Sequence, residues 1–271
     1  MAIITISRGT FSGGKAVAEK LAEKLDYPCL SREILIKKAA QHFQLEEHQL
    51  NDAMEEVPGL LDGDASVSAA NVNFVRAVLL NEIRSQELVY HGYAGDLLLK
   101  GVKKILRIRV IASIDYRIEA AMRDHQIDSN EARKMIEQLD RKRNKWSEIV
   151  LGTEWSDPSL YDVALSLDSI SLDSAVDTIK QLTELDEFTV DDTTSRSLED
   201  LLISSNIWAA LSRNNHTRSV QLEIVTINGH VTIYGDVNSR KTAEMIVYTA
   251  EQEKGVEDVT SKLNVGMSWL W

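Results

Sequence analysis

The spacing of apolar and polar positions at the start of the chain predicts a strand, a loop and a helix in that order. Ile3, Ile4 and Ile6 form a short β-branched run, which is typical of a buried strand. After a glycine-rich loop, apolar residues recur at helical spacing from Val17 to Leu25. This order of elements is the frame of a phosphate-binding loop.

The loop itself fits the spacing G-x-x-x-x-G-K through Gly9, Gly14 and Lys15. Glycines let the backbone curl until several N–H groups point at one anion, and the helix N-terminus adds partial positive charge. Lys15 would bring a mobile charge to the outer phosphates. Ala16 stands where the usual pattern has the Ser or Thr that binds Mg²⁺. A tight strand-to-helix turn that binds nothing is therefore the alternative.

The alternation of strand and helix patterns continues to about residue 183. Further strands are predicted at 88–93, 105–112 and 161–167, and helices from Ser31, over 71–84, over 114–146 in two pieces, and over 172–182. Residues 57–68 are expected to form a loose loop over a site or an oligomer contact. Strands that alternate with helices predict a parallel sheet with covered faces, whose ligands lie beyond the carboxyl ends of the strands. The glycine loop is in that position.

A different pattern follows an acidic stretch rich in Ser and Thr at residues 184–197, which we interpret as a linker. An amphipathic helix is predicted over 198–211. Alternating segments then flank Asn228-Gly229, a strong signal for a two-residue hairpin turn. Ser239 can cap another helix, and 256–265 is expected to be a last strand. Residues 198–271 are thus predicted to form a second, small α+β domain.

The composition narrows the classes of partner. The formal net charge is −12, which argues against a nucleic-acid-binding protein and against strong binding to an anionic membrane. The single cysteine, Cys29, permits no intrachain disulfide. We see no apolar run of transmembrane length and no signal-peptide pattern, so we expect a cytoplasmic protein.

One segment departs from the acidic average. Residues 133–145 concentrate six basic side chains, among them Arg141 and Arg143. A solvated helix face with i,i+4 ion pairs would explain them. The alternative is a mobile lid over residues 127–155 whose arginines close on polyphosphate.

Several short stretches, taken in order, carry a family resemblance. They are Ile4-Thr-Ile-Ser-Arg, Ser12-Gly-Gly, Leu25-Asp-Tyr-Pro, Ser31-Arg-Glu-Ile-Leu, Gly92, Arg117-Ile-Glu, Asp140-Arg-Lys-Arg and Trp155-Ser-Asp-Pro-Ser-Leu-Tyr-Asp. Through them, residues 1–183 resemble the cytidylate kinase-like family of P-loop nucleoside monophosphate kinases. The resemblance implies a P-loop NTPase-type α/β fold, with a parallel sheet and helices on both faces. It also implies phosphoryl transfer from ATP to CMP or a similar nucleotide, with Mg²⁺.

The resemblance and the loop motif together give a set of expected site residues. Around the donor nucleotide we expect Gly9, Ser12, Gly13, Gly14, Lys15 and Ala16. Around the acceptor we expect Arg32, Gly92, Tyr93 and Asp140. Lys15, Arg141 and Arg143 are expected to be catalytic, and no side chains are assigned to a metal site.

Three positions depart from the family pattern. Relatives carry an arginine for the acceptor phosphate where this chain has Tyr93, and a glycine where it has the bulky Phe11. His91 stands close to where better-known kinases have an acid. The alternatives are therefore a catalytically weak or inactive pseudokinase that senses nucleotide, and an assembly protein that does not bind nucleotide.

The C-terminal region resembles a BON domain. Its marks are Asn228-Gly-His-Val-Thr-Ile-Tyr-Gly-Asp-Val and Gly255-Val-Glu-Asp-Val, which are mostly apolar and turn positions. The resemblance implies contact with phospholipid or protein. Because the chain is acidic, we expect self-association or a protein partner rather than a membrane.

Overall fold

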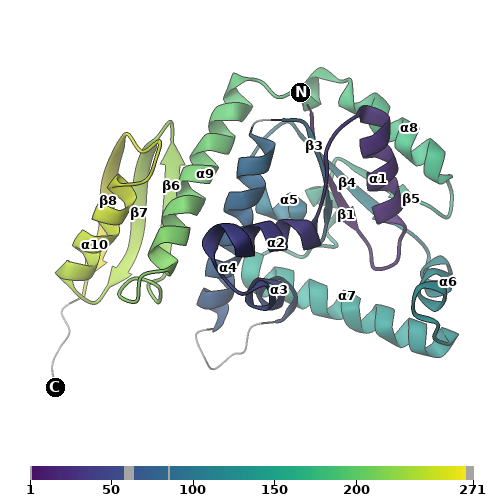
Figure 1. The fold of residues 1–271 in the computed structure, drawn as a ribbon, viewed down its shortest axis with the longest axis horizontal. Helices are drawn as coiled ribbons and strands as arrows, with labels where there is room; N and C mark the ends of the chain where they lie inside the picture. Colours follow the sequence, from purple (N-terminus) through teal and green to yellow (C-terminus); the bar gives the residue numbers. More distant parts are fainter. Residues whose placement is uncertain (1, 58–63, 85, 267–271) are drawn as a thin grey trace. The chain divides into compact units, whose positions relative to one another are not determined.

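The structure is a computed structural model, and it describes residues 2–57, 64–84 and 86–266 (Figure 1). These residues form two compact units, which are described separately below. Among them, no helix combines the length and the apolar character needed to cross a membrane.

The first unit, formed by residues 2–37, 55–57 and 86–191, holds a five-stranded sheet. The strands follow one another across the sheet in the order β2 (Cys29–Ser31), β3 (Leu88–Gly92), β1 (Ile3–Arg8), β4 (Ile105–Ile111) and β5 (Val163–Ser166). Every neighbouring pair is parallel. The predicted parallel α/β sheet is confirmed. The short strand β2 was not predicted.

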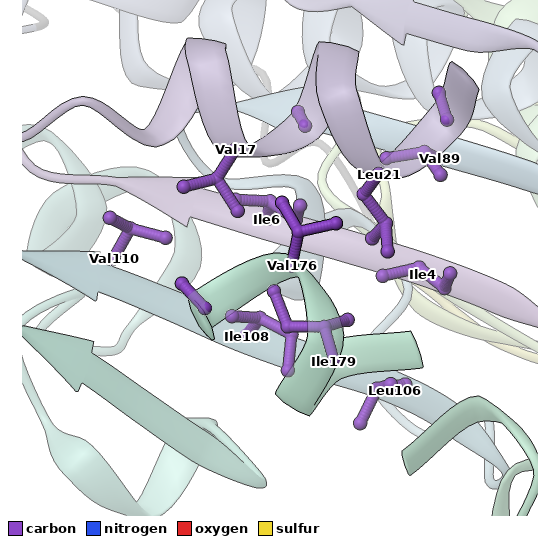
Figure 2. Packing of buried hydrophobic residues seen from close by; sticks show 13 residues of the cluster. Ile4, Ile6, Val17, Leu21, Val89, Leu106, Ile108, Val110, Val176 and Ile179 are labelled. Carbon is purple, nitrogen blue, oxygen red and sulfur yellow. The ribbon is translucent and has the colours of Figure 1, made fainter. Parts of the chain in front are cut away.

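Two helices cover one face of this sheet, α1 (Gly14–Leu25) and α8 (Leu172–Thr183). Figure 2 shows Val17 and Leu21 of α1 and Val176 of α8 gathered around Ile6 of β1. All four side chains are almost completely buried. Burial of this apolar surface drives the sheet and the two helices together.

The other face carries polar side chains. Successive residues of a strand point to opposite faces, so Thr5 and Ser7 of β1 and Arg109 of β4 lie opposite the apolar core. The short helix α5 (Gly95–Leu98) packs against β1 on this side, and all four of its residues are buried. Helices thus lie on both faces, and the polar face is the one available for a site.

Of the four further helices, three begin at a capping residue that the sequence supplies. The four are α2 (Arg32–Phe43), α3 (Glu47–Glu55), α6 (Ile114–His125) and α7 (Ser129–Leu151), with short 3₁₀ turns at Pro158–Leu160 and Asp186–Phe188. The N–H of Ile34 donates to the Ser31 hydroxyl at 3.2 Å, as predicted. Asp128 and Glu131 form a reciprocal capping box at the start of α7.

The second unit contains a three-stranded sheet with helices packed on it. Its elements are α9 (Asp192–Ser212), β6 (Leu222–Ile227), β7 (His230–Val237), α10 (Arg240–Glu251) and β8 (Asp258–Val265). Strands β6 and β7 are antiparallel, whereas β7 and β8 are parallel. Asn228 and Gly229 both have positive φ, at 51° and 79°, which confirms the predicted hairpin turn.

The helix α4 (Asp64–Ile83) belongs to this second unit and packs along α9. Its start corrects the sequence analysis, because residues 64–68 of the predicted loose segment are helical. Residues 58–63 of that segment lie outside the described residues. Residues 192–197 of the predicted linker form the first turns of α9, and the domain boundary itself stays a prediction.

Candidate functional site

The glycine loop joins the central strand β1 to α1 and is fastened to β4. The N–H of Gly9 donates to the carbonyl of Val110 at 3.1 Å. The Ser12 hydroxyl lies 2.8 Å from that same oxygen and 2.9 Å from the carbonyl oxygen of Gly9. Ser12 is buried, so its side chain holds the loop in shape. The N–H of Ser12 also donates to the carbonyl of Gly9, at 3.1 Å, so the backbone donor of Ser12 serves the loop as well.

Two glycines are needed where the loop enters α1. Gly13 has φ +81° in the left-handed region, and Gly14 lies so close to β1 that a Cβ would stand 2.6 Å from Cβ of Arg8. A helix leaves its first N–H groups without intrahelical partners. The backbone of Gly14, Lys15 and Ala16 therefore presents the donors that a phosphate group binds.

Lys15 is available for a ligand. Its side chain is 64% exposed, and its ion-pair contact in the structure is with Glu19, one turn along the helix, at 3.7 Å. Exposed pairs of this kind contribute little to stability. Lys15 can therefore leave Glu19 for a phosphate at small cost.

The loop is also tied to the basic helix α7. The Thr10 hydroxyl donates to Oδ1 of Asp140 at 2.7 Å and accepts from Nη1 of Arg143 at 2.9 Å. Arg117 of α6 donates to the carbonyl of Thr10 and to Oδ2 of Asp140, at 2.6 and 2.7 Å. Two of the predicted residues, Asp140 and Arg143, thus lie directly at the loop. Arg141 is 72% exposed and faces Glu137 at 3.8 Å, away from it.

Phe11 does not crowd the loop as expected. Its left-handed φ of 58° turns the side chain toward α6 and α7, where it packs on Ile118 and Ile136. Its ring meets His125 edge-on at 5.4 Å. Phe11 anchors the loop to these two helices and leaves the phosphate side of the loop clear.

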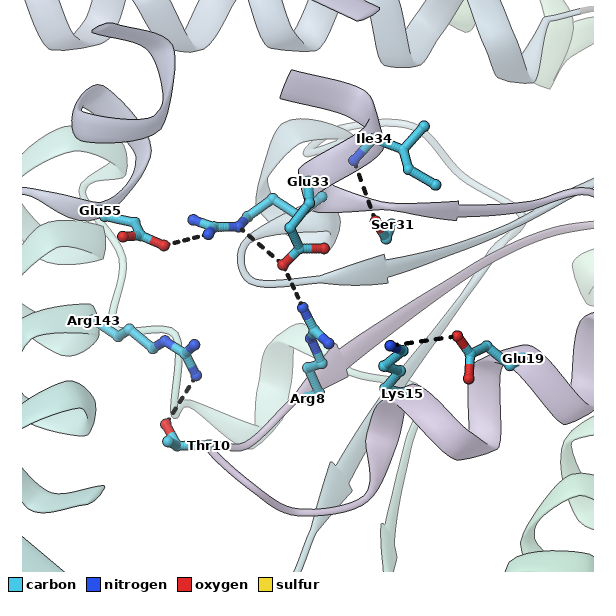
Figure 3. Close-up of polar contacts among 10 residues, drawn as sticks. Arg8, Thr10, Lys15, Glu19, Ser31, Glu33, Ile34, Glu55 and Arg143 are labelled. Carbon is cyan, nitrogen blue, oxygen red and sulfur yellow. Dashed lines mark hydrogen bonds and ion pairs between the residues drawn. The ribbon is translucent and has the colours of Figure 1, made fainter. Parts of the chain in front are cut away.

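Three arginines from three elements gather beside the loop, and Figure 3 labels two of them, Arg8 and Arg143. Arg8 at the end of β1 donates to Glu33 at 2.8 Å, and Arg32 at the start of α2 pairs with Glu55. Burial, and then the neighbouring charges of Arg32 and Arg8, lower the pKa of Arg143 to about 10. The guanidinium groups are therefore close enough to repel one another, and an anion between them would relieve that repulsion.

Tyr93, at the expected arginine position, supports Arg143. Its buried ring meets Trp146 and Trp155 edge-on at 5.2 and 5.4 Å, and its hydroxyl donates to the backbone carbonyl of Arg143. The guanidinium of Arg143 lies 5.5 Å from the centre of the Tyr93 ring. Arg109 of β4 stacks on the same Trp155 at 4.1 Å. Aromatic rings thus hold two arginines on the polar face of the sheet.

A cavity of about 390 Å³ opens between the loop and the ends of β2 and β3. It is lined by Arg8, Lys15, Glu19, Cys29, Ser31, Glu33, Ile34 and His91. Burial, and then Arg8, lower the pKa of His91 to about 4, so the imidazole is neutral at pH 7. The cavity thus combines two cations, Arg8 and Lys15, with two carboxylates, Glu19 and Glu33, and an anion that enters it would compete with these carboxylates for the cations.

The comparisons with known proteins agree with this geometry. The model of the cytidylate kinase-like family matches residues 3–169, which is more than half of the chain. The chain belongs to this family. The BON domain model matches residues 199–267. No curated protein matches the sequence.

Solved structures share the fold of the kinase-like domain. A protein from Eubacterium ventriosum, described as uncharacterized, is 22% identical with a TM-score of 0.51, and the match covers 67% of this chain and 98% of that one. Shikimate kinase from Bacteroides thetaiotaomicron is 14% identical with a TM-score of 0.43, over 68% of this chain and 99% of that one. The likeness to the Eubacterium ventriosum protein indicates a common fold and carries no information about the substrate.

Within the cytidylate kinase-like domain, sequence reasoning gave no role to Arg8, Arg109 or Asp96. Both arginines carried a signal, since Arg8 follows the buried strand directly and Arg109 interrupts an apolar one. Asp96 carried none. It is buried on α5, and neither carboxylate oxygen has a hydrogen-bond partner among the described residues. Burial raises its pKa to about 6, against the effect of Arg107 and Arg109.

Proposed function

We propose that the kinase-like domain binds ATP on the glycine loop and a nucleoside monophosphate such as CMP beside it, and transfers the terminal phosphoryl group between them. The observation that carries the proposal is that Arg8 and Lys15 line one cavity, and that Arg32 and Arg143 lie close enough to Arg8 for their charges to interact. Enzymes of this class work mainly by positioning the two nucleotides and neutralising their charge.

Each cation then has a distinct task. Lys15 and the N–H groups at the start of α1 hold the donor phosphates. Arg32 and Arg8, at the carboxyl-terminal edge of the sheet, face the acceptor phosphate. Arg143 bonds Thr10 of the loop and can bridge the two groups. An acceptor phosphate oxygen attacks the terminal phosphorus as its bond to ADP breaks, and the guanidinium groups stabilise the developing charge.

A second candidate function is nucleotide sensing without turnover. Two observations favour it: Ala16 offers no hydroxyl to a metal ion, and Tyr93 brings no charge to the acceptor. In this case the bound nucleotide would act on a partner through the BON domain.

The BON domain is proposed to contact a second copy of the chain or another protein. Its sheet leaves Ile227 of β6 64% exposed, and α10 leaves Tyr248 63% exposed. Light scattering over a range of concentrations would measure assembly, and Ile227→Lys is expected to weaken it. A chain that stays monomeric at every concentration would exclude the second copy.

Thermal shift and ADP formation test the kinase-like function together. ATP is expected to raise the melting temperature, and the size of the shift follows from mass action. Lys15→Ala should abolish most of it, whereas Lys15→Arg keeps the charge and should retain part. ADP formation that depends on CMP would support the transferase. Binding of both nucleotides without ADP formation would select the sensor, and no shift with any nucleotide would refute both.

A further inference from the structure

The side chains around the loop are poor ligands for Mg²⁺. This ion prefers oxygen ligands in octahedral geometry, and P-loop enzymes hold it with a Ser or Thr of the loop and a carboxylate. Here the residue after Lys15 is Ala16, which has no side-chain oxygen. At the end of β3, level with Ile6 of β1, stands the buried imidazole of His91. An imidazole nitrogen suits transition metals better than Mg²⁺.

The carboxylates that line the cavity already have cationic partners. Glu33 accepts a hydrogen bond from Arg8 at 2.8 Å and lies 3.9 Å from Arg32. Burial would raise the pKa of Glu33, but its hydrogen bonds and Arg8 outweigh burial, and the pKa lies below its usual range. Glu19 faces Lys15. Over the residues that the structure describes, no three His, Cys, Asp or Glu side chains are grouped as a metal site. The donor set therefore does not fit Mg²⁺.

Positive charge is plentiful at the same place. Lys15 is exposed at the head of α1, and Arg8 and Arg143 approach from β1 and α7. Arg143 is nearly buried and has no ion-pair partner within 4.0 Å among the described residues, although Asp140 lies near it. Guanidinium groups bind phosphate oxygens with paired hydrogen bonds, so they can supply the neutralisation that Mg²⁺ gives elsewhere.

We infer that the kinase-like domain binds its nucleotide as the metal-free polyphosphate, and that Lys15 and Arg143 take the place of Mg²⁺ in the binding step. The inference rests on the proposed nucleotide binding. It concerns which ionic form of the nucleotide the site selects. Mg²⁺ in solution would lower the charge of the free nucleotide and compete with these side chains for its phosphates.

Calorimetric titration of the full chain tests this inference, with a non-hydrolysable ATP analogue in EDTA and in excess Mg²⁺. We expect binding in EDTA to be at least as tight as in Mg²⁺, and Arg143→Gln to weaken binding in EDTA about tenfold or more, which is about 1.4 kcal/mol. Binding that tightens tenfold or more on addition of Mg²⁺ would overturn the inference and leave the proposed function standing. No binding in either buffer would refute both.

A pair of variants at Ala16 tests the structural cause. Ala16 is exposed, so the fold should tolerate both Ala16→Thr and Ala16→Val, which have the same shape. Only threonine restores a hydroxyl beside the phosphates. We expect Ala16→Thr to bind more tightly in Mg²⁺ than in EDTA, whereas the ratio of the two affinities in Ala16→Val should equal that of the unmodified protein, whatever the affinity itself. Equal metal dependence in the two variants would overturn the argument from the missing hydroxyl.

Discussion

Thr10→Val should destabilise the kinase-like domain far more than its small change in shape suggests. The Thr10 hydroxyl is buried and joins Asp140 at 2.7 Å to Arg143 at 2.9 Å. Valine keeps the volume and loses both bonds. Hydrogen bonds to charged groups contribute about 1.5–3 kcal/mol each, so the loss should be about 3 kcal/mol or more. For a domain of this size, that corresponds to a melting temperature lower by about 6–12 °C.

Thr10→Ser is the matched control, because serine keeps the hydroxyl and loses one methyl group. Its cost should be about 1 kcal/mol or less. Circular dichroism melts of the three proteins would give the comparison. ATP should bind most tightly to the unmodified protein, less tightly to Thr10→Ser and least tightly to Thr10→Val, because the hydroxyl fixes the loop to α7. Melting temperatures of the valine and serine variants within about 2 °C of each other would refute the assigned role of the hydroxyl.

Four further predictions concern buried groups of the kinase-like domain and the helix α7. Tyr93→Phe should lower the free energy of unfolding by about 1 kcal/mol, because it loses the hydrogen bond to the carbonyl of Arg143. Tyr93→Arg should lower it further, because it buries a second cation beside Arg143. Equal melting temperatures of the two variants would contradict the buried position of Tyr93 beside Arg143. The Asp96→Asn variant keeps the lowered pKa of His91. Between about pH 4 and 6.5 its unfolded state therefore binds more protons than its folded state, so the free energy of unfolding, measured with urea, should rise with pH over this range. The His91→Gln variant keeps the raised pKa of Asp96, so its folded state binds more protons and its free energy of unfolding should fall with pH between about pH 4 and 6. If the free energy of unfolding changed with pH in the same direction in both variants, the pKa shifts assigned to His91 and Asp96 would be refuted. Hydrogen exchange in α7 should slow when ATP and CMP are added, with α8 as the internal control, and unchanged exchange would exclude a closing lid.

The frame of the site could be predicted from the sequence because its signals are local. A β-branched run, three glycines within six residues and a helical repeat specify strand, loop and helix without reference to the rest of the chain. The hairpin at Asn228-Gly229 is of the same kind. Strand β2 is too short for any periodic signal, and it exists because β3 pairs with it.

The sequence also held a signal for the difference between Arg141 and Arg143. Arg141 and Arg143 are two residues apart, and an α-helix turns by about 200° over two residues. The two side chains therefore point in nearly opposite directions and cannot face the same neighbour. Ala132 and Ile136 are buried, and helical spacing from them leads through Asp140 to Arg143. Composition alone treats both arginines as lid residues, whereas the phase of the helix separates them.

The role of Tyr93 could not be predicted in this way. Its partner, the carbonyl of Arg143, is 50 residues away along the chain. Local patterns carry no information on such a contact, and comparison with the family suggested only that a charge was lost. In the structure, Arg143 of α7 lies near the position where relatives carry an arginine, and Tyr93 holds Arg143 there.

The central place of β1 has a consequence for biosynthesis. Ile3 pairs with Leu88 on one side and with Ile105 on the other, so β1 has no strand partner until about 80 more residues have followed it, and its second partner comes later still. During that time its isoleucines are exposed to every other nascent apolar segment. Translation speed over residues 10–105, and chaperones that bind short apolar runs, should therefore govern the yield of folded protein more strongly than changes near β5 do.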